Sequence, residues 1–173
     1  MAQAQGSAGI VLDMRGYPGE EGFNCLSHLA QQRMFSPQFL IPVWAGPDER
    51  RLDNSGQWHI DTLEPLYSGP VVLLVGPVTV SAAETLSTML VDGQRVKKVV
   101  GRQSAGTNGN ITYLRTPGGL YFSFTGIDVR HVDGGTYHGI GIVPDIEVHP
   151  RAEDFATGAD RAIEAAIAAL RAP

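Results

Sequence analysis

Residues 71–91 read VVLLVGPVTVSAAETLSTMLV, a strand-like run followed by a helix-like stretch. The five apolar residues at 71–75 predict a buried strand, and the segment from Thr85 to Val91 predicts a helix. Ser81 lies at the turn between them, where the positive end of the helix dipole would face its hydroxyl. Open α/β folds keep their ligand sites at this carboxyl edge of the sheet. Ser81 is therefore a candidate nucleophile.

The same serine also has a purely structural explanation. Ser81-Ala82-Ala83-Glu84 fits a capping box, in which the serine caps the helix and Glu84 reaches back to the serine backbone. Helix caps are much commoner than nucleophiles, so this segment taken alone favours the cap. The two roles are compatible, and the rest of the chain has to decide whether Ser81 is also catalytic.

Composition places the chain among globular proteins. It has 173 residues, of which 43% are hydrophobic and 18% charged, enough for one domain with a substantial core. The net charge of -5 argues against a nucleic-acid partner, and no apolar stretch reaches the ~18 residues of a membrane span. The single Cys25, expected half-buried on a helix, excludes a disulfide framework, and we expect no metal or other cofactor. The chain starts almost directly with a strand and without a signal peptide, as in a fragment of a longer protein.

The remaining segments suggest alternating strands and helices. The expected elements are a strand at 9–13, a loop at 15–22, a helix at 23–35, a hairpin of 39–44 and 57–60 around a polar turn at 46–56, a strand at 96–100, a polar loop at 103–110, a hairpin of 111–115 and 120–125, a strand at 142–148 and a helix at 159–172. This order implies a mostly parallel sheet with right-handed crossovers. The loop after Asp13, the turn at Ser81 and the loop after Gly101 should then meet at one edge and form a site.

Four blocks of sequence carry a family resemblance. They are GIVLDMRGYPG at 9–19, the segment 67–84 around Ser81, VVGRQSAG at 99–106 and GIGIVPDIEV at 139–148. Their identity and order resemble the C-terminal processing (tail-specific) serine peptidases, whose relatives include the tricorn core protease and the interphotoreceptor retinoid-binding protein. The resemblance implies an α/β fold with a crotonase/ClpP-like core, a mostly parallel sheet flanked by helices, and β-hairpins, in a single catalytic-core domain at 1–173.

The resemblance also implies roles for individual residues. Ser81 matches the acylating serine, and the backbone amides of Ala82 and Gly19 would stabilise the oxyanion, as tetrahedral intermediates require. Asp13 and Arg15 keep their family identities and are expected to pair and hold the loop that contains Gly19.

The general base is where the sequence departs from the family. Thr107 stands where the processing peptidases have their lysine, which points to the tricorn-like branch. Lys97 and Lys98 are expected to be exposed charges at the start of a strand. His138 falls where that branch has an assisting glutamate, and it is either a base or a structural histidine. The base of the tricorn-like branch would come from a region that this chain does not contain.

Three functions remain open at this point. The first is a serine endopeptidase core that cleaves unstructured polypeptides, and the second is a non-catalytic module of the same fold that binds a ligand or peptide. The third, a crotonase-type acyl-CoA enzyme, fits the block around Ser81 less well. We expect a polypeptide substrate, no nucleic acid and no membrane span, and bare edge strands would favour a homo-oligomer.

Overall fold

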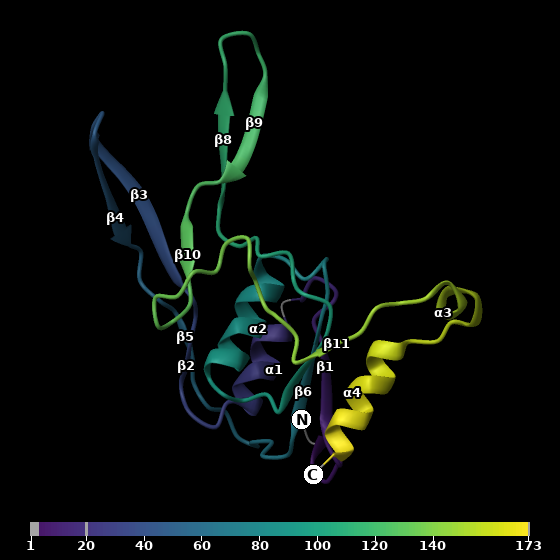
Figure 1. The fold of residues 1–173 in the computed structure, drawn as a ribbon. Coiled ribbons are helices and arrows are strands. Elements are labelled where there is room, and N and C mark those ends of the chain that lie inside the picture. Colours follow the sequence, from purple (N-terminus) through teal and green to yellow (C-terminus); the bar gives the residue numbers. More distant parts are fainter. Residues whose placement is uncertain (1–3, 20, 173) are drawn as a thin grey trace.

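A parallel sheet of four strands, in the order β1-β6-β7-β11, forms the centre of the structure (Figure 1). Its strands are β1 (Ile10–Asp13), β6 (Val71–Val75), β7 (Lys98–Gly101) and β11 (Ile146–Glu147). The computed structural model describes residues 4–19 and 21–172. Every residue of β6 is buried, as expected for the central strand of a sheet that is covered on both faces.

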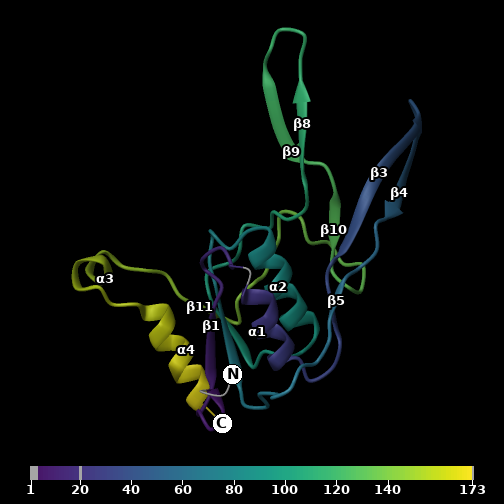
Figure 2. The same cartoon turned by 180° about the vertical axis from the view of Figure 1, so that it is seen from behind.

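Helices cover both faces of this sheet (Figures 1 and 2). The helices α1 (Glu21–Leu29) and α2 (Ala82–Asp92) pack on one face, and α4 (Arg161–Arg171) packs on the other. The alternation of β6 divides the core: Leu73 faces α1 and α2, whereas Leu74 faces the alanine-rich side of α4. The predicted parallel sheet flanked by helices is confirmed.

Two hairpins project from one end of this body (Figures 1 and 2). One consists of β8 (Ile111–Arg115) and β9 (Tyr121–Thr125), as the sequence predicts. The other consists of β3 (Gln38–Gly46) and β4 (Glu49–Asn54), with β10 (Asp128–Arg130) on the free side of β3. A short ladder joins β2 (Met34–Phe35) to β5 (His59–Ile60).

The predicted helix at 23–35 is too long, because the chain leaves the helix after Leu29. Arg95 Nε and Gln31 Nε2 donate to the Leu29 carbonyl, at 2.6 and 3.4 Å, which satisfies the helix end with side chains. Met34 is buried, but on a strand that pairs with Ile60. A single apolar residue beyond a helix fits the spacing of a helix as well as that of a strand, so the sequence could not distinguish the two.

Three further expectations need correction. The polar segment at 46–56 contains β4, whose side chains are all exposed and therefore show no alternating apolar pattern. As a result β3 pairs with β4 and not with 57–60. The last strand covers only 146–147, and Pro144, which has no amide hydrogen, lies two residues before it. The short helix α3 (Ala152–Thr157) has no counterpart in the expected elements.

Candidate active site

Three loops meet at the carboxyl edge of the parallel sheet, as the sequence predicts. The Thr79 hydroxyl donates to the Met14 carbonyl at 2.8 Å, which ties the turn before α2 to the loop after β1. The Ala105 amide donates to the Thr79 carbonyl at 3.2 Å, and the Ser81 amide donates to the Thr107 carbonyl at 2.9 Å. These bonds join the turn that carries Ser81 to both neighbouring loops.

Ser81 has an unusual backbone at the start of α2. Its φ is 53° and its ψ is -118°, a combination that residues with a β-carbon rarely adopt and that costs about 1–3 kcal/mol. Hydrogen bonds on both sides hold it there, since the Thr85 amide also donates to the Ser81 carbonyl at 2.9 Å. A strained serine between a strand and a helix is the geometry that exposes the hydroxyl in a nucleophile elbow.

The expected capping box is wrong. The Ser81 side chain makes no hydrogen bond that caps α2, and Glu84 turns into the interior, where its exposed fraction is 0%. Glu84 Oε1 accepts from the Ser104 hydroxyl at 2.5 Å and from the Gly106 amide at 2.7 Å, and Oε2 accepts from the Thr107 amide at 3.0 Å. Three donors satisfy a buried carboxylate better than the single amide of a cap would. The Ser81 hydroxyl therefore has no capping role.

The polar loop that binds Glu84 is also held from its other side. The Ser104 hydroxyl accepts from the Ile142 amide at 2.8 Å, so this one side chain bridges the carboxylate and the closing segment of the chain. The Asn108 side chain donates to the Thr85 hydroxyl on α2, also at 2.8 Å. The loop beside Ser81 is thus fixed by buried polar contacts with α2, which pre-organises the backbone around the serine.

Tyr137 is fully buried beside this network, and its hydroxyl has no hydrogen-bond partner among the described residues. Burial, together with the neighbouring Glu84 carboxylate, raises the pKa of the Tyr137 hydroxyl above its usual value. The phenol therefore stays neutral over the ordinary pH range, and it brings no second negative charge to Glu84.

A cavity of about 170 Å³ opens beside Ser81. The rings of Phe23 and Trp58, whose centroids are 5.5 Å apart, form one wall. The rest of the lining consists of Phe39, Ala82, Thr85, Asn108, Gly109 and Asn110. No lysine, arginine or histidine of the described residues belongs to this lining. The aromatic walls suit one apolar side chain of a ligand placed next to Ser81.

The other predicted site residues differ in whether they line this cavity. Ala82 belongs to the lining, whereas Gly19 lies in the loop between β1 and α1 and does not. His138 Nε2 lies 2.8 Å from the Asn108 carbonyl, and because a carbonyl only accepts, Nε2 carries a hydrogen. Ser81 and Ala82 thus both line the cavity, whereas His138 does not line it and contacts Asn108, which does.

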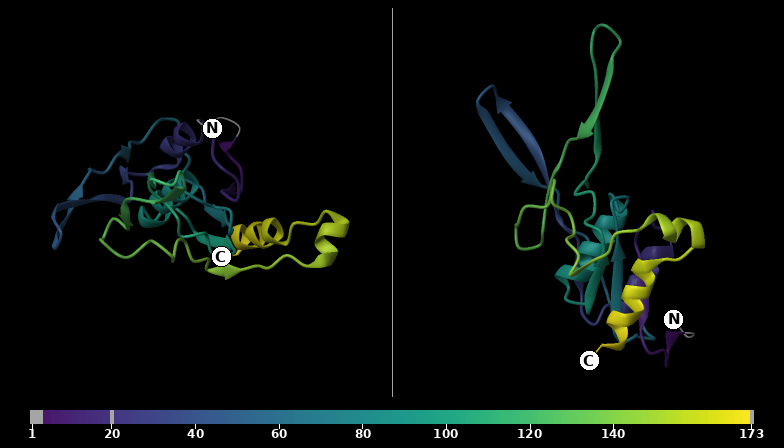
Figure 3. Two further views of the ribbon diagram at one scale, coloured as in Figure 1. Left: turned by 90° about the horizontal axis from the view of Figure 1, so that it is seen from above. Right: turned by 45° about the vertical axis from the view of Figure 1, so that its right-hand side comes forward.

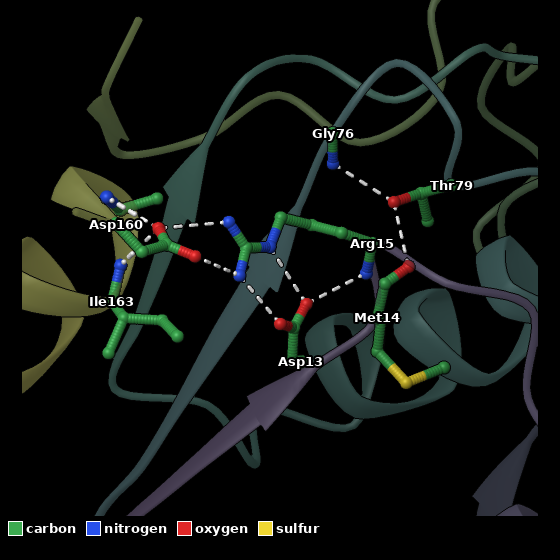
Figure 4. A network of polar contacts seen from close by, with 8 residues as sticks. Asp13, Met14, Arg15, Gly76, Thr79, Asp160 and Ile163 are labelled. Carbon is green, nitrogen blue, oxygen red and sulfur yellow. Dashed lines mark hydrogen bonds and ion pairs between the residues drawn. The ribbon is translucent and has the colours of Figure 1, made fainter. Parts of the chain in front are cut away.

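Asp13, Arg15 and Asp160 form an ion-pair network at the same edge of the sheet (Figure 4). Arg15 donates to both oxygens of Asp13, at 2.9 and 2.7 Å, and to both oxygens of Asp160, at 3.1 and 2.8 Å. Asp160 also caps α4 by accepting from the amides of Ala162 and Ile163. The predicted pairing of Asp13 with Arg15 is confirmed, and it extends to the C-terminal helix.

This network makes stability depend on pH. Hydrogen bonds from Arg15 lower the pKa of both Asp13 and Asp160. A lowered folded pKa means that the stabilisation is complete above the ordinary carboxyl pKa of about 4 and is lost as the pH falls through the folded pKa. We expect Asp160→Asn, which keeps the helix cap, to cost about 1 kcal/mol at pH 7, because solvent screens these half-exposed groups.

Urea unfolding at several pH values checks this expectation. The difference in unfolding free energy between the native chain and Asp160→Asn should shrink as the pH falls from about 5 to 3. Asp48→Asn, in the exposed turn between β3 and β4, is the matched control and should show no such trend. A difference that stays constant down to pH 3 would contradict the role assigned to Asp160.

Two features of this site were not predicted from the sequence. The buried position of Glu84 could have been inferred, because residues 82–91 contain no other charged residue, as in a helix that is buried on all sides. For the aromatic wall of the cavity the sequence contains no comparable indication. Phe23 and Trp58 are 35 positions apart in the sequence and meet only because α1 packs beside β5.

A larger cavity, of about 490 Å³, lies between the edge of the sheet and the segment from α3 to α4; Arg15 and Asp160 line it, whereas Ser81, Ala82, Gly19 and His138 do not. Within residues 4–19 and 21–172, no group of three or more histidine, cysteine, aspartate or glutamate side chains could hold a metal ion. No helix in the described part of the chain has both the length and the apolar character needed to cross a membrane.

The fold is α/β with a crotonase/ClpP-like core, which confirms the predicted fold class. The sequence model of peptidase family S41 matches residues 1–148, and the chain belongs to this family of serine peptidases. The predicted resemblance to C-terminal processing peptidases is thereby confirmed. No curated protein matches the sequence at a significant level.

Several solved structures share this fold. A predicted peptidase from Parabacteroides merdae is 22% identical with a TM-score of 0.81, over 99% of this chain and 54% of that protein. The photosystem II D1 C-terminal processing protease is 25% identical, with a TM-score of 0.58, over 87% of this chain and 37% of that one. The tricorn protease is 20% identical, with a TM-score of 0.61, over 94% of this chain and 15% of that one. The chain spans about half the length of the first of these relatives.

Proposed function

We propose that residues 1–173 form one catalytic-core domain of a serine endopeptidase that cleaves unstructured polypeptides through an acyl-enzyme on Ser81. The observation that carries the proposal is the strained backbone of Ser81, at φ 53°, with a side chain that does not cap its own helix. Strain of this kind persists where the surroundings enforce it, and it is frequent at reacting residues. Membership of family S41 supplies the reaction class.

In this mechanism Ser81 Oγ attacks the scissile carbonyl while a base takes the hydroxyl proton. The oxyanion forms next to the Ala82 amide, from which no described residue accepts a hydrogen bond. That amide is one of the first N–H groups of α2, where the helix dipole also favours negative charge. Gly19 is the proposed second donor. Each such donor lowers the activation barrier by about 3 kcal/mol. The ring wall of Phe23 and Trp58 would hold an apolar substrate side chain.

The base is proposed to come from outside residues 1–173. No basic side chain of the described residues lines the cavity, and His138 uses Nε2 to donate to the Asn108 carbonyl. When its ring is neutral, His138 keeps Nδ1 as an acceptor. If the base lies within residues 1–173 after all, His138 is the first candidate. Since the chain spans about half of its first structural relative, a longer parent protein is the proposed source of the base.

Labelling with a fluorophosphonate probe tests this function. We expect slow modification of Ser81 in the isolated chain and at least about tenfold faster modification when imidazole supplies the missing base. Ser81→Ala should abolish labelling, whereas Ser68→Ala, at an exposed position in the loop before β6, should leave the rate unchanged. Circular dichroism confirms that each variant is folded. A folded chain that stays unlabelled with imidazole would favour a non-catalytic binding module, for which the lack of a base in the cavity is the supporting observation.

A further inference from the structure

The hairpin of β8 and β9, here called the β8–β9 arm (residues 111–125), exposes an unusual amount of apolar surface. Seven of its large side chains are each between 51% and 69% exposed: Ile111, Tyr113, Leu114, Leu120, Tyr121, Phe122 and Phe124. Soluble monomers rarely expose contiguous apolar patches of this kind. A hairpin of two strands is also marginally stable by itself in water. We therefore expect the arm to pack against another surface.

One face of the arm is the apolar one. In the β8–β9 register Leu114 lies opposite Phe122, and Phe124 lies two positions further along the same face. The other face carries polar groups, namely the Tyr113 and Tyr121 hydroxyls and the Arg115 guanidinium, which lies 5.4 Å from the centre of the Tyr121 ring. Leu114, Phe122 and Phe124 carry no polar side-chain group, so theirs is the face that needs a partner.

A complementary face exists on the other hairpin. Pro42 lies opposite Leu52 in the β3–β4 register, and Trp44, which is 63% exposed, lies on the same face. Figures 1 and 3 show that the two hairpins are splayed apart within one chain, so this face does not cover the β8–β9 arm of its own copy. Each chain thus carries one apolar arm and one apolar receiving face.

We propose that two copies of this chain form a twofold dimer by exchanging β8–β9 arms. The Leu114, Phe122 and Phe124 face of each copy packs on the Pro42, Trp44 and Leu52 face of the other copy. This arrangement is isologous, since each copy gives one arm and receives one. It rests on the exposed surfaces alone and not on the function proposed for Ser81.

Buried area distinguishes this exchange from a simple stacking of two arms. A fully buried aromatic side chain covers about 150–250 Å², so half-exposed side chains on one arm offer roughly 400 Å². Two stacked arms would bury roughly 800 Å² in total, the size of a crystal contact. Two reciprocal arm-to-hairpin contacts would bury roughly 1,300 Å², within the range of specific interfaces.

The position of the two hairpins agrees with the exchange. Both hairpins begin at the cavity beside Ser81, because Phe39 of β3 and Asn110, which precedes β8, line it. The exchange would therefore hold two walls of that cavity in place.

Sedimentation of the 173-residue chain tests the proposal at concentrations from about 1 to 50 μM. We expect a dimer with a Kd of about 10 μM or below, and monomers for both Phe124→Lys and Trp44→Lys. Mixing these two variants should restore a weaker heterodimer, because one intact contact remains between them. Tyr113→Lys, on the opposite face of the arm, is the matched control and should stay dimeric.

Two results would overturn the exchange. A monomeric native chain at about 50 μM would show that the arm is not covered by a second copy. A dimeric Trp44→Lys variant that Phe124→Lys still dissociates would show that the arms stack on each other. Urea midpoints within about 0.3 M of the native value ensure that each variant is compared as a folded protein.

Discussion

Replacing Glu84 with alanine is expected to lower the free energy of unfolding by about 3–5 kcal/mol, a large part of the stability of a domain of this size. The carboxylate is fully buried and accepts from Ser104, Gly106 and Thr107. The substitution leaves three donors without an acceptor, of which the Ser104 hydroxyl and the Gly106 amide are buried, and each buried unsatisfied donor costs about 1–3 kcal/mol. It also leaves a cavity where the side chain stood. Chemical denaturation of the variant measures the loss.

Two comparison variants separate the carboxylate from its volume. Glu84→Gln keeps the shape but places an amide NH₂ against donors, so it should lose less than the alanine variant, about 1–3 kcal/mol. Glu164→Ala, an exposed glutamate in the first turn of α4, should change stability by less than about 0.5 kcal/mol. A Glu84→Ala variant as stable as Glu164→Ala would mean that Glu84 does not hold the loop.

The central sheet could be predicted because its signal is local. The uninterrupted apolar run at 71–75 is typical of a strand that is covered on both faces, and all five residues are buried in the structure. The shared edge of the three loops followed from topology, since the carboxyl ends of parallel strands must lie together. Ser81 was placed at that edge for the same reason.

The inward turn of Glu84 could not be predicted from the four residues of the capping motif. A cap and a buried carboxylate require the same spacing between serine and glutamate, and they differ only in what packs above the helix. Here the polar loop presents Ser104, Gly106 and Thr107 at that point. The strand β4 was missed for a related reason. β4 pairs with β3 through backbone hydrogen bonds. Because its side chains are exposed, its sequence lacks the alternating apolar pattern that would predict a strand.

Replacing Gly101 with alanine is the second substitution with a large expected effect, about 3–5 kcal/mol. Gly101 ends β7 at the edge of the sheet, with φ at +125°, and a Cβ built there would lie 2.2 Å from the Val75 carbonyl oxygen. That oxygen accepts from the Arg102 amide at 3.1 Å, so the strands β6 and β7 cannot separate without losing a ladder bond. Both the backbone conformation and the close approach therefore oppose a side chain. Urea unfolding of Gly101→Ala measures the combined cost.

Gly119→Ala separates these two causes. Gly119 lies in the turn of the β8–β9 arm with φ at +81°, and a Cβ there would meet no atom within 4 Å. Its substitution should therefore cost only the backbone strain, about 1–2 kcal/mol. The excess cost at Gly101 is then the cost of forcing β6 and β7 apart at the edge where the loops around Ser81 begin. Equal losses for the two variants would mean that the sheet edge yields easily, and that close packing of β6 and β7 does not fix the position of these loops.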